Sequence, residues 1–177
     1  MNPPENFETE RLILRKPCME DAPAIFTSYA QDTEVTRYMT WSPHKNIEET
    51  YGIMRIMLKS WEAGSAYSFA ILPKNLNSVI GMIAMHPDGF KVEIGYVLAR
   101  PYWGKGIVTE AARRITTWLL EQPDIYRVFA TCDVENLASA RVMEKAGMTC
   151  EGILRRNTIR FNVSNEPRDT FIYSIVK

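Results

Sequence analysis

Cysteine and histidine are scarce in this chain of 177 residues. Its three cysteines, Cys18, Cys132 and Cys150, are far apart in the sequence and odd in number. This argues against a disulfide framework and against a cysteine-based zinc site. The two histidines, His44 and His86, are too far apart in sequence to suggest a metal pair. We therefore expect no metal site and reduced cysteines without a chemical role. The alternative is that one of the cysteines is a catalytic thiol.

The sequence also lacks a long hydrophobic run and an excess of charge of either sign. No apolar stretch approaches the roughly 20 residues that span a bilayer, and the N-terminal MNPPENFETE has no basic or apolar region typical of a signal peptide. Its 21 basic residues balance 21 acidic residues, so no overall field attracts the chain to nucleic acid or to an anionic membrane. These absences predict a cytoplasmic protein that binds neither nucleic acid nor membrane.

The periodicity of the apolar residues predicts one α/β (α+β) domain over residues 1–177. Between residues 66 and 98 the period changes from 3.6 to 2, which is typical of an antiparallel meander. A meander followed by strand, helix and strand indicates a mixed, mostly antiparallel central sheet with helices on both faces. The predicted elements are, in order, a strand (11–16), two helices (18–32 and 46–64), three strands (66–72, 78–85 and 90–98), a helix (106–121), a strand (125–133), a helix (137–147) and two strands (near 149–155 and 169–176).

The turn Gly104-Lys105-Gly106 leads without a break into the predicted helix at 106–121. Helix N-termini expose unpaired N–H groups and a partial positive charge, which together favour phosphate. Glycine removes the Cβ that would hold an anion away from the backbone. We interpret the turn as a phosphate site; the alternative is that its glycines only shape a loop into a helix.

Two nucleotide-binding motifs compete for this turn. A Walker A loop requires Ser or Thr directly after its Gly-Lys pair, whereas Lys105 lies between two glycines, so this motif is excluded. A Rossmann turn requires a third glycine where this chain has Thr109, and it follows the first strand of a parallel sheet. An oxidoreductase is therefore disfavoured, although Asp133 could serve as its ribose-binding acid.

Four stretches of the sequence together resemble the GNAT acyltransferase superfamily, and within it the RimJ/RimL-type branch. They are residues 8–26, 92–111, 134–148 and 151–155. In the family these correspond to the first strand and helix, the acyl-CoA pyrophosphate loop with its preceding strand, an Asn-x-x-Ser helix and the strand behind it. The resemblance covers nearly the whole chain, and the four motifs in this order are specific.

The resemblance implies acetyl-CoA as cosubstrate. Asn136 and Ser139 correspond to the asparagine and hydroxyl beside the cofactor arm, and Lys145, with Arg141, could meet the CoA phosphates. Exposed basic helix residues are, however, usually only solvated. Residues similar to the splayed strand that pairs with the pantetheine arm are Tyr96, Val97, Leu98 and Ala99. Residues similar to the pyrophosphate loop are Gly104, Lys105, Gly106, Ile107, Val108 and Thr109.

The loop departs from the wider superfamily pattern at two positions. Trp103 stands where that pattern has Gln or Arg, a departure that is usual in the RimJ/RimL-type branch. Val108 replaces Gly or Ala, which is acceptable if only its backbone N–H is used.

Two residues are candidates for catalysis. Glu93 is the candidate general base, because other GNAT branches carry a catalytic glutamate on the corresponding strand; the alternative is a strand glutamate that orders the sheet or binds substrate. Ser139 is the candidate proton donor to the leaving thiolate; the alternative is a helix cap. The acceptor site is expected between Glu93 and the segment that contains Tyr38, Met39 and Trp41.

The reaction implied is transfer of an acetyl group from acetyl-CoA to a primary amine, by direct attack in a ternary complex. The branch suggests the N-terminal amine of a protein, such as a ribosomal protein. Small-molecule amines (amino acids, polyamines or aminoglycosides) and a non-catalytic acyl-CoA-binding sensor are the alternatives. The resemblance also allows a homodimer.

Overall fold

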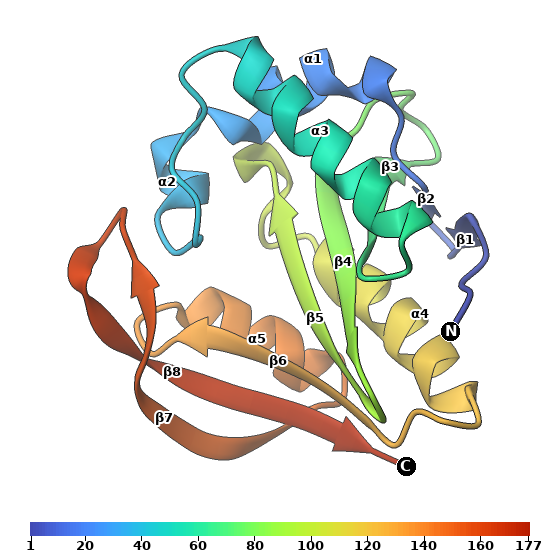
Figure 1. Cartoon of the computed structure of the whole chain (residues 1–177), viewed down its shortest axis with the longest axis vertical. Coiled ribbons are helices and arrows are strands. Elements are labelled where there is room, and N and C mark those ends of the chain that lie inside the picture. The colour runs from blue at the N-terminus through green and yellow to red at the C-terminus, as the bar shows by residue number, and fades with distance from the viewer.

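The computed structural model describes residues 1–177 and contains one eight-stranded sheet (Figure 1). The strand order is β1-β2-β3-β4-β5-β6-β8-β7. All neighbouring strands are antiparallel except β5 and β6, which pair in parallel. This mixed sheet confirms the predicted fold class. The strands are β1 (Asn6–Glu8), β2 (Leu12–Arg15), β3 (Tyr67–Pro73), β4 (Gly81–Asp88), β5 (Lys91–Leu98), β6 (Arg127–Asp133), β7 (Thr149–Arg160) and β8 (Ser164–Val176).

Helices cover both faces of the sheet because the central strands alternate apolar residues to either side. Phe69 and Ile71 of β3 belong to a core cluster with α4 (Ile107–Glu121) and α5 (Leu137–Lys145). Ala70 and Leu72 belong to a second cluster with α1 (Ala22–Ile25), α2 (Thr33–Thr36) and α3 (Ile47–Glu62). The sheet therefore has an α4/α5 face and an α1/α3 face.

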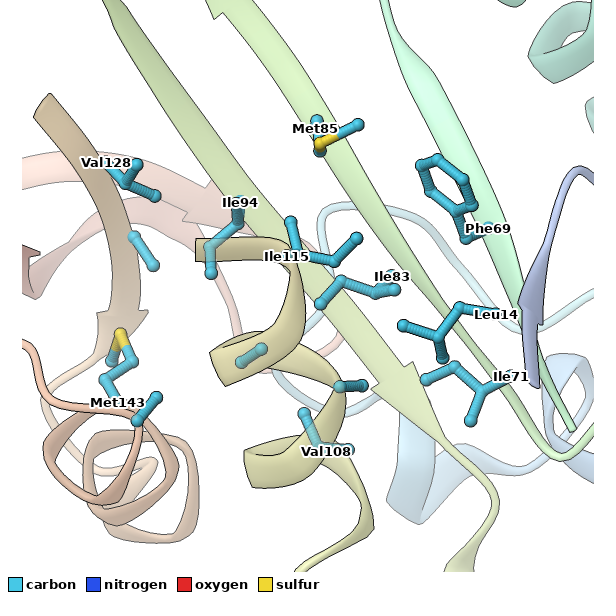
Figure 2. Close-up of a cluster of buried hydrophobic side chains, with 14 of the residues drawn as sticks. Leu14, Phe69, Ile71, Ile83, Met85, Ile94, Val108, Ile115, Val128 and Met143 are labelled. Carbon is cyan, nitrogen blue, oxygen red and sulfur yellow. The ribbon is translucent and has the colours of Figure 1, made fainter. Parts of the chain in front are cut away.

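The larger core lies under α4 (Figure 2). Ile115 points from this helix toward Ile83 of β4 and Ile94 of β5, and all three side chains are fully or almost fully buried. Burying a side chain of this size stabilises the fold by about 1.5–3 kcal/mol. The helix that begins at the glycine turn is thus anchored to the middle of the sheet. No helix in the chain combines the length and apolar character that crossing a bilayer requires.

The N-terminal region is more irregular than the predicted strand and single helix. Residues 18–32 form a 3-10 turn, η1 (Met19–Asp21), then α1, then a π-helical turn, η2 (Phe26–Ala30). Pro23, at the start of α1, has no N–H to donate, and such a residue interrupts regular helical hydrogen bonding. Strand β1 and helix α2 had not been predicted; α2 begins where the Asp32 carboxylate accepts the N–H groups of Glu34 and Val35.

The β7–β8 hairpin is longer than the two predicted strands. Its register shifts between Cys150 and Gly152 and again between Leu154 and Thr158. Such bulges interrupt the two-residue alternation by which strands are recognised in a sequence. The extra length carries Arg160 and the following turn to the segment between α2 and α3.

Gly81 is required by the close approach of β4 to β5. A Cβ at this position would lie 2.4 Å from the carbonyl oxygen of Val97. We expect Gly81→Ala to lower the free energy of unfolding by about 1–3 kcal/mol, because the two strands must move apart. Denaturant unfolding measures this loss. Gly95→Ala is the matched control, since no atom lies within 4 Å of its added Cβ; equal stability of the two variants would contradict the prediction.

Candidate active site

Strands β5 and β6 separate partway along their length. They pair only from Lys91 with Arg127 to Glu93 with Phe129, while β5 continues to Leu98 and β6 to Asp133 (Figure 1). Beyond Glu93, β5 is bonded to β4 along one edge and has no strand on the other. This unpaired edge can accept an extended ligand between the two strands.

The glycine turn at the end of β5 has the geometry of an anion-binding site. Gly104 and Gly106 both have φ = +73°, a left-handed conformation that glycine adopts without steric cost. Gly106 is the N-cap of α4, and the first helical bond runs from the Glu110 N–H to the Gly106 carbonyl. The N–H groups of residues 107–109 donate to no group of the protein. They are free to bind an anion at the positive end of the helix.

Arg11, which had not been predicted as a site residue, fastens this turn to β2. Its Nε lies 2.6 Å from Glu110 Oε2, and its Nη1 donates to the Lys105 carbonyl at 3.1 Å. Thr9 Oγ1 also donates to Glu110, at 2.6 Å. Burial alone would raise the pKa of Glu110, but the hydrogen bonds from Thr9 and Arg11 lower it. The ionised glutamate thus holds Arg11 beside the turn.

A basic concavity of about 600 Å³ lies along the outer side of α4 next to Gly106. Its lining includes two carboxylates, those of Glu10 and Glu110, and an excess of cationic side chains, those of Arg11, Arg113, Arg114 and Lys145. Arg113 also donates to the Lys145 carbonyl, which joins the end of α5 to α4. Lys145, predicted to meet CoA phosphates, is therefore close to the turn, whereas Arg141 is not part of this lining.

Tyr96 and Ser139 meet across the separated strands, on the α4/α5 face. The two hydroxyl oxygens are 2.8 Å apart, and the Tyr96 hydroxyl also donates to the Ser139 carbonyl at 3.1 Å. Burial raises the pKa of Tyr96, and the hydrogen bond with Ser139 only partly offsets this effect. Asn136, rather than Ser139, caps α5 by accepting the Ser139 N–H at 3.2 Å. The Ser139 hydroxyl therefore has no capping role.

The end of β5 is partly bonded within the protein. The Leu98 carbonyl accepts the Trp103 indole N–H at 2.7 Å, and the Ala99 N–H donates to the Ile80 carbonyl at 2.8 Å. The indole thus stands in the loop where other GNAT branches have Gln or Arg, and it joins the turn to the strand. Tyr96 and Val97 lie nearer the point of separation.

Glu93 faces the opposite side of the sheet. Its neighbours Val92 and Ile94 are buried in the α4/α5 cluster, so alternation directs Glu93 to the α1/α3 face. Thr131 Oγ1 of β6 donates to Glu93 Oε1 at 3.3 Å. The structure therefore separates the two predicted catalytic residues, with Ser139 on one face and Glu93 on the other.

The predicted acceptor segment lies on the α1/α3 face and is held by the tip of the β7–β8 hairpin. Arg160 Nη1 donates to the Tyr38 carbonyl at 2.6 Å. Asn162 Nδ2 donates to the carbonyls of Thr36 and Trp41, both at 2.8 Å. Met39, the remaining predicted residue, is half-buried in the same segment. The length of this hairpin, which sequence periodicity missed, thus brings Arg160 and Asn162 to the acceptor segment.

Cys132 does not have the properties of a nucleophilic thiolate. Its side chain is buried at the end of β6, and this burial raises the pKa of the thiol to about 11. The thiol therefore stays protonated near neutral pH, where the thiolate is the reactive form. This argues against the alternative of a catalytic cysteine at this position.

The separated strands, with the glycine turn on one side and an acidic residue on the other, fit an acyltransferase that uses a CoA thioester. Comparison with known proteins agrees: the model of the acetyltransferase (GNAT) domain matches residues 11–149. An uncharacterized N-acetyltransferase of Bacillus subtilis, YoaA, is 31% identical over 97% of this chain and 96% of its own length. The chain belongs to the GNAT acetyltransferase family, and its reaction is N-acetyl transfer from acetyl-CoA.

Solved structures share the whole architecture. A GNAT-family acetyltransferase from Bacillus anthracis superposes with a TM-score of 0.83 at 29% identity, over 97% of this chain and 98% of that one. RimL, a ribosomal alpha-N-protein acetyltransferase in complex with coenzyme A, has the same fold, with a TM-score of 0.85 at 21% identity and the same coverage. The likeness to RimL shows that the two proteins share a fold.

Proposed function

We propose that the chain acetylates the N-terminal amine of a protein, such as a ribosomal protein, by direct attack in a ternary complex. The observation that carries this proposal is the two-sided arrangement around the unpaired edge of β5. Anion-binding and hydroxyl groups lie on the α4/α5 face, and a carboxylate lies on the α1/α3 face. Acceptor and donor can therefore meet between the strands without a covalent enzyme intermediate. RimL, which shares this fold, is a ribosomal alpha-N-protein acetyltransferase, and this supports a protein N-terminus as the acceptor.

The residues on the α4/α5 face fit a CoA thioester. The N–H groups of residues 107–109 would hold the pyrophosphate, and the absence of a Cβ at Gly104 and Gly106 lets its oxygens approach the backbone. The free edge of β5 at Tyr96 and Val97 would pair with the pantetheine arm. Asn136 Nδ2 makes no hydrogen bond within the protein and is available to the same arm. The bound cosubstrate supplies an acetyl thioester as the electrophile.

The basic concavity beside the turn would take the phosphate on the ribose of CoA. Arg113 and Lys145 line it, as does Arg11, which also donates to the Lys105 carbonyl of the turn. Several cations around one concavity raise the local concentration of an anionic ligand even when the net charge of the chain is zero.

Glu93 would remove a proton from the acceptor ammonium, directly or through water. A carboxylate on the acceptor face can accept this proton while the amine approaches from the same side. Thr131, which donates to one carboxylate oxygen, leaves the other oxygen for the acceptor.

Ser139 would supply the hydrogen bond or proton that the leaving thiolate needs. Its partner Tyr96 remains a neutral phenol near pH 7 because burial raises its pKa. The phenol O–H donates to the Ser139 carbonyl, so the phenol oxygen can accept the Ser139 hydroxyl until that hydroxyl turns to the leaving thiolate. In this arrangement Tyr96 is a positioning residue for Ser139.

Thiol release from acetyl-CoA tests the proposed function. The acceptors are peptides with free N-termini, amino acids, polyamines and aminoglycosides, and calorimetry measures acetyl-CoA binding separately. Faster thiol release with peptides than with small amines supports the proposal. Faster release with a small amine would instead identify that small amine, and not a protein N-terminus, as the acceptor. Binding of acetyl-CoA without release for any acceptor would point to an acyl-CoA-binding sensor.

For Glu93→Gln we expect kcat to fall by about 100-fold, because the amide cannot accept the ammonium proton. Affinity for acetyl-CoA should not change, because Glu93 faces away from the turn. Steady-state kinetics and calorimetry give the two values. Thr131→Val is the control, since it removes the hydrogen bond to Glu93 but keeps the carboxylate. If Glu93→Gln turns over as fast as the wild type, Glu93 is not the general base and has only a structural role.

A further inference from the structure

Arg160 carries a buried positive charge whose hydrogen bonds are largely unmade. The residue ends β7 and is 7% exposed. Its Nη1 donates to the Tyr38 carbonyl at 2.6 Å, whereas its buried Nε has no hydrogen-bond partner. A guanidinium has five N–H donors, and leaving a buried charged donor unpaired costs more than a lost neutral hydrogen bond.

The nearest acid does not balance this charge. Asp133 Oδ2 lies 4.0 Å from Arg160 Nε, beyond hydrogen-bonding distance. The fully buried Asp133 carboxylate is already engaged: it accepts Arg168 Nε at 2.5 Å and Nη2 at 3.0 Å, and the Glu135 N–H at 2.9 Å. Two arginines thus lie beside one buried carboxylate, and only Arg168 is hydrogen-bonded to it.

The pKa shifts of Asp133 and Arg160 agree with these contacts. Burial alone would raise the pKa of Asp133, but the hydrogen bonds from Arg168 and Glu135 lower it. Burial lowers the pKa of Arg160, and the carboxylates of Asp133 and Glu93 only partly oppose this effect. Asp133 is thus a satisfied anion, and Arg160 is a cation that lacks a close partner.

Arg160 lies on the acceptor side of the sheet. Ala130 and Cys132 of β6 are buried in the α4/α5 cluster, so alternation directs Thr131 and Asp133 to the opposite face. Thr131 contacts Glu93 there, Asp133 is the acid nearest Arg160, and Arg160 contacts the segment that contains Tyr38. The weakly paired cation and the candidate base therefore share the face from which the amine would approach.

We propose that Arg160 binds a carboxylate of the acceptor, and hence that the preferred acceptors are amines that carry a carboxylate near the amino group. The inference rests on the proposed function and narrows its substrate class. Nη1 is bonded to the Tyr38 carbonyl and Nε is buried beside Asp133, whereas Nη2 makes no hydrogen bond within the protein and is not fully buried. A carboxylate can therefore accept from Nη2 through a charge-assisted hydrogen bond. The carboxylate can belong to a free amino acid or to an acidic side chain near a peptide N-terminus.

A purely structural role for Arg160 would be to fasten the hairpin to the acceptor segment. Asn162 does the same from two residues away, through its bonds to Thr36 and Trp41, and it carries no charge. Asn162→Ala therefore reproduces a loosened hairpin while it leaves the cation in place. A charge-dependent effect separates the two roles.

The test compares matched acceptors by thiol release from acetyl-CoA. One pair is L-methionine and its amide; the other is the peptides Ser-Asp-Ala and Ser-Asn-Ala, both with amidated C-termini. We expect the wild type to favour the carboxylate member of at least one pair by 10-fold or more in kcat/KM. In Arg160→Gln this ratio should fall to about one, and Arg160→Lys should retain part of it. Asn162→Ala should lower both members of the pair equally.

The outcomes distinguish the inference from the function on which it rests. A preference confined to the peptide pair would identify acidic protein N-termini, and one confined to methionine would identify free amino acids. A wild-type ratio near one in both pairs, or a ratio that Arg160→Gln leaves unchanged, would overturn the inference while thiol release upholds the acetyltransferase. If Arg160→Gln does not fold, the kcat/KM ratios of the wild type and of Arg160→Lys still test the inference. Absence of release with every acceptor would instead contradict the proposed function.

Discussion

Replacing Ser139 with alanine is expected to lower kcat by about 100-fold or more, the range typical of losing a group that protonates a leaving atom. In the proposed mechanism the thiolate of CoA leaves on the α4/α5 face, where the Ser139 hydroxyl lies 2.8 Å from the Tyr96 hydroxyl. Asn136 caps α5 through the backbone N–H of residue 139, so the substitution leaves the cap intact. Steady-state kinetics at saturating acetyl-CoA measures the loss, and calorimetry should give near wild-type affinity.

Tyr96→Phe is the companion variant, because it keeps the aromatic ring and removes the hydroxyl that orients Ser139. We expect a fall of about 10-fold in kcat. Burial raises the pKa of this phenol, so the ratio of variant to wild type should not change between about pH 6 and 9, where the phenol stays protonated. Full activity of Ser139→Ala would remove the hydroxyl pair from the mechanism, and a pH-dependent ratio would contradict the neutral role given to Tyr96.

Gly106→Val is expected to weaken acetyl-CoA binding by about 100-fold or more. A β-branched residue strongly disfavours φ = +73°, so the turn must change its conformation and the N–H groups of residues 107–109 lose their common direction. Hydrogen bonds to a charged group contribute about 1.5–3 kcal/mol each, so losing one or two of them accounts for this factor. Calorimetric titration with acetyl-CoA measures the affinity directly.

Gly89→Val provides the matched control for the turn. Gly89 has φ = +60°, it is exposed like Gly106, and it lies in the turn between β4 and β5, outside the site. Both variants should lose a similar free energy of unfolding, about 1–2 kcal/mol, from the left-handed backbone. Only Gly106→Val should lose affinity. Equal affinities of the two variants for acetyl-CoA would show that the turn does not hold the cosubstrate.

The sequence predicted the parts of the site that depend on local chemistry. Gly104 and Gly106 indicated a strained turn because few other residues adopt positive φ, and the helix that follows begins where the apolar period of 3.6 begins. The meander at 66–98 was recognised because its strands alternate regularly. The bulged β7–β8 hairpin was underestimated because its alternation is broken.

Contacts between distant segments were not predictable in this way. Tyr96 was predicted only for its backbone, yet its hydroxyl meets a residue 43 positions later in the sequence. Arg11 and Arg160 resembled ordinary surface arginines, because no local pattern indicates that one fastens the glycine turn or that the other is buried. The bond from Arg160 to Tyr38 joins residues 122 positions apart.

By itself, the sequence determined the class of fold and the glycine turn, because backbone conformation and hydrophobic period depend on neighbouring residues. The reaction class followed from the resemblance of four motifs to the GNAT superfamily. The tertiary structure alone decided which side chains share a face of the sheet. It put Ser139 with Tyr96 on one side of β5 and Glu93 on the other, and it carried Arg160 to the acceptor segment. Burial and charge balance depend on these long-range contacts, so the cation that lacks a close partner became visible only after the chain had folded.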